Sequence, residues 1–288
     1  MALSTKYDWF LLDQPDVGAL RATKEIIHQS IQSVAAVGRT FAPSDEREED
    51  SNAKLIWVPG LWRMAGAWVN SESSFRSSIS LKDKMLYLVD PRMNTLDELS
   101  LVGHNYNDLM LWVEQQIIRH NLSSSQFSTG LPYTLPNYAT DFRKIIDDSS
   151  LTYSEILGGH YHNAFILFQS FSAYSYTMSD IAIYPHHFDM ETKIILKDTR
   201  DVSTDTFVRL GFSPGDTEIA SPYLYINGWP QITGEVLPKA PLESYWVSDG
   251  WYGLVLEFSH VYGMADQAEY TLAFLQEGLD IFKSLLLD

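Results

Sequence analysis

Cysteine is absent from the 288 residues of this chain. Its absence excludes disulfides, thiolate catalysis and zinc sites built on cysteine. Basic residues are scarce, with 20 Lys and Arg against 37 Asp and Glu, which gives a net charge of -17. Because so acidic a chain repels phosphate backbones and anionic membrane surfaces, we expect neither nucleic acid nor a membrane among its partners.

Several sequence signals are missing as well. Met1 to Tyr7 lack the basic start and the apolar run of a signal peptide, and no apolar run is long enough to span a bilayer. We therefore expect a soluble cytoplasmic protein. No strand leads into a Gly-rich phosphate loop, so no nucleotide site is indicated. Ser213 lies in Gly-Phe-Ser-Pro-Gly, but the proline after it removes a backbone N–H that an oxyanion hole needs, which speaks against a serine hydrolase.

Apolar residues make up 45% of the chain, which is normal for a protein with a real core. Helical spacing of apolar residues predicts helices after Pro15, from Asn107, from Thr152 and at the C-terminal end. Between them lie runs of short segments rich in β-formers. Adjacent strands without crossover helices favour antiparallel pairing, so the predicted fold class is α+β.

The stretch from Ser123 to Asn137 has the composition of a linker, rich in serine, glycine and proline. We place the boundary between two halves there, with an N-terminal half over 1–125 and a C-terminal half over 138–288. Both halves share the order helix, strands, helix, so we expect two similar halves, each with antiparallel strands flanked by helices. Residue identity between them is weak, and internal duplication is a hypothesis.

The concentrated polar chemistry lies in the C-terminal half. Pro-His-His-Phe-Asp at 185–189 sits on a predicted strand, where alternation points His187 and Asp189 to one side and His186 to the other. Such a His–Asp pair can ligate a divalent metal or act in acid–base chemistry. It can also simply stabilise a strand edge.

Asp216 ends a Ser-Pro-Gly-Asp turn and is a candidate third group. Tyr223 and Tyr225 follow on one strand face and suit either the wall of a ligand pocket or a packed sheet face. His160 and His162 have a metal-like spacing, but the capping box at Thr152 favours a helix, on which residues two apart diverge.

The order of motifs resembles an uncharacterised bacterial protein family. The pattern is Pro-His-His-Phe-Asp at 185–189, Gly-Phe-Ser-Pro-Gly-Asp at 211–216, Pro-Tyr-Leu-Tyr at 222–225 and Trp-Pro at 229–230. Tyr184 stands where the family pattern has tryptophan. The function of that family is not established, so the resemblance implies a stand-alone bacterial protein and transfers no activity.

Our leading hypothesis is a cytoplasmic protein that binds a small molecule. The predicted ligand-binding residues are His186, His187, Asp189, Asp216, Tyr223 and Tyr225. One alternative is a metal-assisted hydrolase with His187 and Asp189 as ligands and Asp216 as third ligand or base. Another is a structural or interaction module in which these residues lock a turn. Cofactor, bound metal and oligomeric state stay open.

Overall fold

The structure is a computed structural model that describes residues 8–45, 51–70, 74–138, 141, 143–174, 176–201, 203–232 and 237–287. It confirms the α+β class, with four α-helices and two antiparallel sheets over the described residues. The α-helices are α1 (Val17–Phe41), α2 (Tyr106–Arg119), α3 (Ser154–Ser170) and α4 (Gln267–Leu287). No helix within these ranges has the length and apolarity needed to cross a membrane.

The chain divides into two compact units. Unit 1 consists of Met1–Gln14, Gly159–Ala182 and Asp189–Asp288, and unit 2 consists of Pro15–Gly158 and Ile183–Phe188. This division does not follow the expected boundary in the 123–137 linker. The reason is that segments before the linker contact segments after it. The Thr23 hydroxyl donates to the Ser150 carbonyl at 2.9 Å, and this contact keeps the segment after the linker with α1. At the other end, the Phe10 amide donates to the Asn163 side chain at 2.9 Å.

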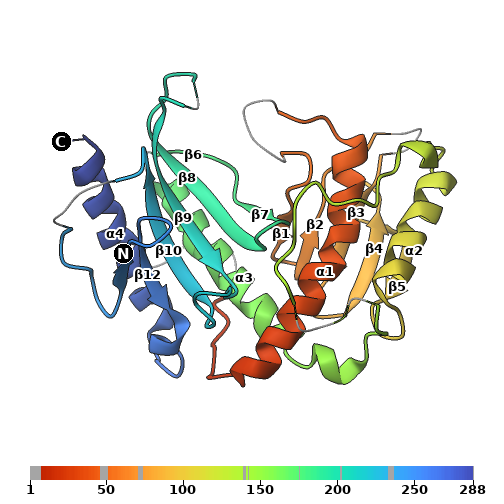
Figure 1. The fold of residues 1–288 in the computed structure, drawn as a ribbon, viewed down its shortest axis with the longest axis horizontal. Coiled ribbons are helices and arrows are strands. Elements are labelled where there is room, and N and C mark those ends of the chain that lie inside the picture. The colour runs from red at the N-terminus through yellow and green to blue at the C-terminus, as the bar shows by residue number, and fades with distance from the viewer. Residues whose placement is uncertain are drawn as a thin grey trace. The chain divides into compact units, whose positions relative to one another are not determined.

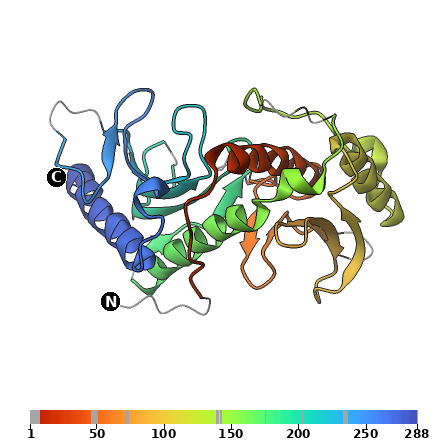
Figure 2. The same ribbon diagram turned by 90° about the horizontal axis from the view of Figure 1, so that it is seen from below.

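Unit 2 contains a five-stranded meander in the order β1-β2-β3-β4-β5. Its strands are β1 (Ile56–Val58), β2 (Arg63–Ala65), β3 (Arg76–Ser80), β4 (Met85–Val89) and β5 (Thr95–Ser100). The helix α1 lies along this sheet, with α2 beside it (Figure 2). Asp16 caps α1 by accepting from the Ala19 amide at 2.9 Å, as the sequence predicts for a helix that begins after Pro15.

Unit 1 is built on the larger sheet, in which the order is β11-β12-β10-β9-β8-β6 and β7 pairs with β8. The strands of this sheet are β6 (Thr177–Met178), β7 (Ala182–Tyr184), β8 (Asp189–Lys197), β9 (Thr206–Ser213), β10 (Tyr223–Trp229), β11 (Tyr245–Val247) and β12 (Gly253–Glu257). Ala182 of β7 belongs to unit 1, and the other two residues of β7 belong to unit 2. Short 3-10 helices occur at Phe171–Ala173 and Phe258–His260 in unit 1, and at Ser124–Gln126 and Asp148–Leu151 in unit 2.

The helix α4 covers one face of the larger sheet (Figure 1). Gly278 lets α4 approach closely, because an added Cβ there would overlap the Ile226 side chain of β10. The residues of this face are apolar and buried, among them Ile194, Leu210 and Leu254. Since successive strand residues point to opposite faces, the other face receives the polar residues of β8, β9 and β10. The two sheets differ in strand number and order, and internal duplication stays a hypothesis.

Candidate functional site

The strand register gathers polar side chains on the face of the larger sheet opposite α4. Glu191 of β8 and Tyr225 of β10 are both paired with Gly211 of β9. One step along, Lys193 and Asn227 both pair with Arg209. Because residues at such paired positions share a face, these side chains form adjacent rows. Asp189 lies two residues before Glu191 and therefore on the same face.

The carboxylate of Asp189 is held by Tyr225. The Tyr225 hydroxyl donates to Oδ2 of Asp189 at 2.5 Å and lies 3.3 Å from Oε2 of Glu191. Gly211 makes this possible, because the Tyr225 ring occupies the space that a Cβ at position 211 would fill. Oδ1 of Asp189 is buried and has no hydrogen-bond donor among the described residues. The arrangement leaves one buried oxygen of this carboxylate unsatisfied, which is costly.

Glu191 is paired with a guanidinium on the neighbouring strand. Nε of Arg209 lies 2.9 Å from Oε2 of Glu191, and Arg209 also donates to the Asn227 side chain at 3.3 Å. Burial raises the pKa of Glu191 to about 7, with Arg209 opposing this shift and Asp189 contributing to it. Burial and the adjacent carboxylates likewise raise the pKa of Tyr225 well above its usual value, so this tyrosine is a hydrogen-bond donor rather than a phenolate.

Asp216 closes its own turn. Its Oδ1 accepts from the Glu218 and Ile219 amides at 2.8 and 2.7 Å, and its Oδ2 accepts from the Tyr223 hydroxyl at 2.6 Å. Tyr223 and Tyr225 are 6% and 7% exposed, with ring centroids 6.0 Å apart. Four predicted site residues, Asp189, Asp216, Tyr223 and Tyr225, thus belong to unit 1, where both tyrosines bind carboxylates.

His186 and His187 belong to unit 2, and their predicted strand geometry is wrong. Residues 185–188 form a turn between β7 and β8, with Phe188 at a φ of 63°. The alternation that would place His187 and Asp189 on one side therefore does not apply. The two imidazoles instead lie next to each other, with ring centroids 4.4 Å apart.

A buried histidine on α1 fixes this turn. Nε2 of His28 lies 2.7 Å from the carbonyl oxygen of Pro185, so it donates a proton there. Nδ1 is left as the acceptor for the Tyr138 hydroxyl. Burial lowers the pKa of His28 to about 3, which agrees with a neutral ring. Gln32 donates to the same Pro185 carbonyl at 2.7 Å, and the Phe188 ring stacks on His28 at 4.8 Å.

No group of three or more His, Asp or Glu side chains in the described part of the chain is placed to hold a metal ion. His160 and His162 lie on α3, as the capping box predicts, and both are buried. Nε2 of His160 forms a hydrogen bond of 3.1 Å with the Tyr262 hydroxyl, and the His160 ring packs against Phe258. Burial lowers its pKa to about 3, so it is a neutral core residue.

Sequence reasoning missed Glu191 and Arg209 as site residues, and also His28. The signal for Glu191 was present, because the charged residues Asp189, Glu191 and Lys193 alternate with the uncharged Met190 and Thr192 once the strand is known to begin at Asp189. No comparable signal marks His28, since its partner, the Pro185 carbonyl, is distant in sequence.

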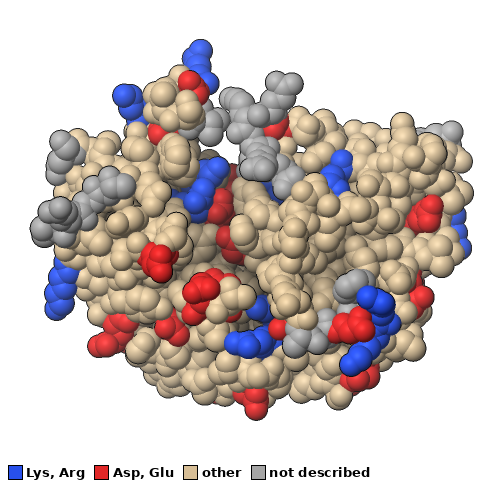
Figure 3. Space-filling view, viewed as in Figure 1, with Lys and Arg blue, Asp and Glu red and all other residues tan. Residues whose placement is uncertain are grey.

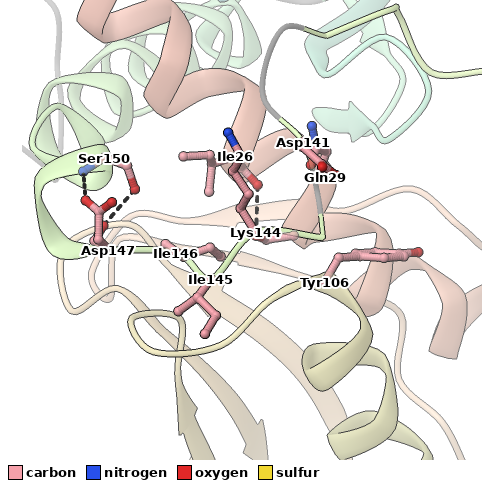
Figure 4. A pocket seen from close by; sticks show the side chains of 10 residues that line it. Ile26, Gln29, Tyr106, Asp141, Lys144, Ile145, Ile146, Asp147 and Ser150 are labelled. Atoms are coloured by element: carbon pink, nitrogen blue, oxygen red, sulfur yellow. Dashed lines mark hydrogen bonds between the residues drawn. The ribbon is translucent and has the colours of Figure 1, made fainter.

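A small pocket lies within unit 2. It encloses about 110 Å³ between α1, the start of α2 and the segment that leads to Ser150 (Figure 4). Ile26 and Ile146 line it together with Tyr106, Gln29 and Lys144. None of the six predicted site residues contributes to this pocket.

Comparison with known proteins gives no indication of what this site does. Neither protein-family models, nor curated proteins, nor solved structures gave a match to this chain. The resemblance to an uncharacterised bacterial family therefore stays a prediction.

Proposed function

We propose that the protein binds a small organic molecule on the polar face of the larger sheet, beside Asp189, Glu191 and Tyr225. The observation that carries this proposal is Oδ1 of Asp189, a buried acceptor without a donor among the described residues. Leaving such an acceptor unpaired costs about 1–3 kcal/mol, more when the group is charged. A ligand that brings an N–H or O–H group to this oxygen removes the penalty.

The surrounding contacts support a rigid binding surface. Asp189 is held by Tyr225, and Glu191 is held by Arg209, all on neighbouring strands of one sheet. Side chains fixed in this way lose little entropy when a ligand arrives, which favours binding. The proposal rests on the residues in unit 1. A part for His186 and His187 in ligand binding, and the cytoplasmic location, stay predictions.

A second candidate is an enzyme that uses Glu191 as a general acid or base. Its support is the pKa of Glu191, which burial raises to about 7, because proton transfer is most effective near the operating pH. The metal-assisted hydrolase is a weaker alternative, because the described residues offer no group of three or more His, Asp or Glu side chains that could hold a metal ion.

The proposal is tested by thermal shift with a mixed panel of metabolites that includes cations, anions and neutral compounds. We expect at least one compound to raise the melting temperature of the wild type, and the shift to shrink in Asp189→Asn. The control is Asp180→Asn, which removes the same charge from an exposed site in unit 1. A panel without any hit, or a hit that both variants bind like the wild type, contradicts the proposal.

A further inference from the structure

Three carboxylates in unit 1 each accept a hydrogen bond from a tyrosine. Besides the pairs Tyr225–Asp189 and Tyr223–Asp216, the Tyr245 hydroxyl donates to Glu257 at 3.0 Å. The strand register connects these pairs, because Tyr223 is paired with Glu257 and both Tyr225 and Tyr245 are paired with Val255. The three pairs therefore lie on one face of the sheet.

Among the residues that the structure describes, these carboxylates have no partner in an ion pair. Across the described ranges, no Lys or Arg forms an ion pair with Asp189, Asp216 or Glu257. The nearest row with positive side chains holds Arg209, whose guanidinium binds Glu191 and Asn227, and Lys193, whose Nζ lies 5.2 Å from the centroid of the Phe207 ring. A tyrosine hydroxyl satisfies a hydrogen bond but leaves the negative charge in place. Acidic side chains also gather over β10, β12 and the adjoining loops in Figure 3.

Aromatic rings border the same carboxylates. Tyr225 lies between Tyr223 and Trp251, with centroid distances of 6.0 and 5.8 Å, and Trp251 is only half-buried. Aromatic faces attract cations by about 0.5–2 kcal/mol. A phenol that donates to a carboxylate is richer in electrons than a free one, so these rings are good partners for positive charge.

We infer that the ligand of this face is a small organic cation with an ammonium group, which donates to Oδ1 of Asp189 and contacts the neighbouring rings. This inference rests on the proposed function and narrows it to one class of ligand. An anion would face three carboxylates, whereas Arg209 and Lys193 lie in a different row of the sheet, next to Glu191. A neutral alcohol would satisfy Oδ1 of Asp189 but would leave the charge of Asp189, Asp216 and Glu257 unbalanced.

Matched compounds test this by isothermal titration. Propyl, cyclohexylmethyl and phenethyl skeletons are each used as ammonium, alcohol and carboxylate, so that only the head group changes. We expect the ammonium member to bind most tightly in at least one set. Asp189→Asn should weaken that binding by about tenfold or more, the size of a lost charge-assisted hydrogen bond. Asp180→Asn should leave it within about twofold, since an exposed charge is screened.

Glu257→Gln is the second variant, because Oδ1 of Asp189 is buried and the replacement of Asp189 can disturb folding. This variant keeps the hydrogen bond acceptor for Tyr245 and removes one charge, so the affinity for the ammonium compound should fall about two- to fivefold. Tighter binding of an alcohol or a carboxylate, in an Asp189-dependent manner, overturns the cation inference and leaves the proposed function standing. Failure of all the compounds, together with failure of the metabolite panel, overturns both.

Discussion

The contact between Gly211 and Tyr225 gives the sharpest test of the site geometry. The two residues are directly opposite each other on β9 and β10, and the Tyr225 ring lies over the Gly211 Cα. An added methyl group in Gly211→Ala would overlap three ring atoms of Tyr225. The ring is buried and cannot swing out without losing its bond to Asp189.

Forced overpacking costs about 1–3 kcal/mol, and a lost hydrogen bond to a charged group costs about 1.5–3 kcal/mol. Because the two effects overlap, we expect Gly211→Ala to lower the free energy of unfolding by about 2–4 kcal/mol. Urea titration followed by tryptophan fluorescence measures this value. Gly60→Ala is the control, since no atom lies within 4 Å of a Cβ built there.

The double variant Gly211→Ala with Tyr225→Ala decides the cause. If the ring is the obstacle, the second substitution removes it, and the two effects on stability should differ from additivity by about 1 kcal/mol or more. Additive effects, or a loss below about 0.5 kcal/mol for Gly211→Ala alone, would refute the packing on which the site depends.

Two further predictions concern titration. The pKa of His28 is lowered by burial to about 3, so below about pH 6.5 the unfolded state takes up a proton that the folded state does not. Stability should therefore fall as the pH drops below about 6.5, and His28→Gln should reduce that slope by up to about 1.4 kcal/mol per pH unit in urea titrations; equal slopes would contradict a neutral His28. The pKa of Glu191 is raised by burial to about 7, so the affinity for the phenethyl ammonium compound should increase as the pH rises through that value. Glu191→Gln should flatten this profile in the same titration, and an unchanged profile would exclude Glu191 from the site.

The sequence predicted the fold class and most elements because their signals are local. Helix α1 begins after a capping aspartate and α4 shows a long apolar stripe, so both are recognisable without their partners. The boundary between the units was harder to predict. Composition identifies a linker, but it does not show which parts of the chain the segments before and after the linker pack against. Contacts such as Thr23 to Ser150 join residues that are 127 positions apart.

Part of the geometry of the proposed site could be predicted from the sequence. Tyr223 and Tyr225 share a face, as strand alternation requires, and both bind carboxylates among the predicted residues. Sequence reasoning did not foresee that the turn before Asp189 breaks the alternation of side-chain directions. Phe188 adopts a left-handed backbone conformation there, which is rare for a bulky residue, and no glycine marks the position in the sequence. Arg209 was missed because its role depends on register between strands, which single-strand patterns do not contain.

The most direct test of ligand binding at this face is a crystal structure with the tightest-binding compound from the two panels. The account predicts a donor group of that compound within hydrogen-bonding distance of Oδ1 of Asp189, with the contact of Tyr225 to Oδ2 retained. A compound bound elsewhere, with Oδ1 of Asp189 still lacking a donor, would contradict the proposed function.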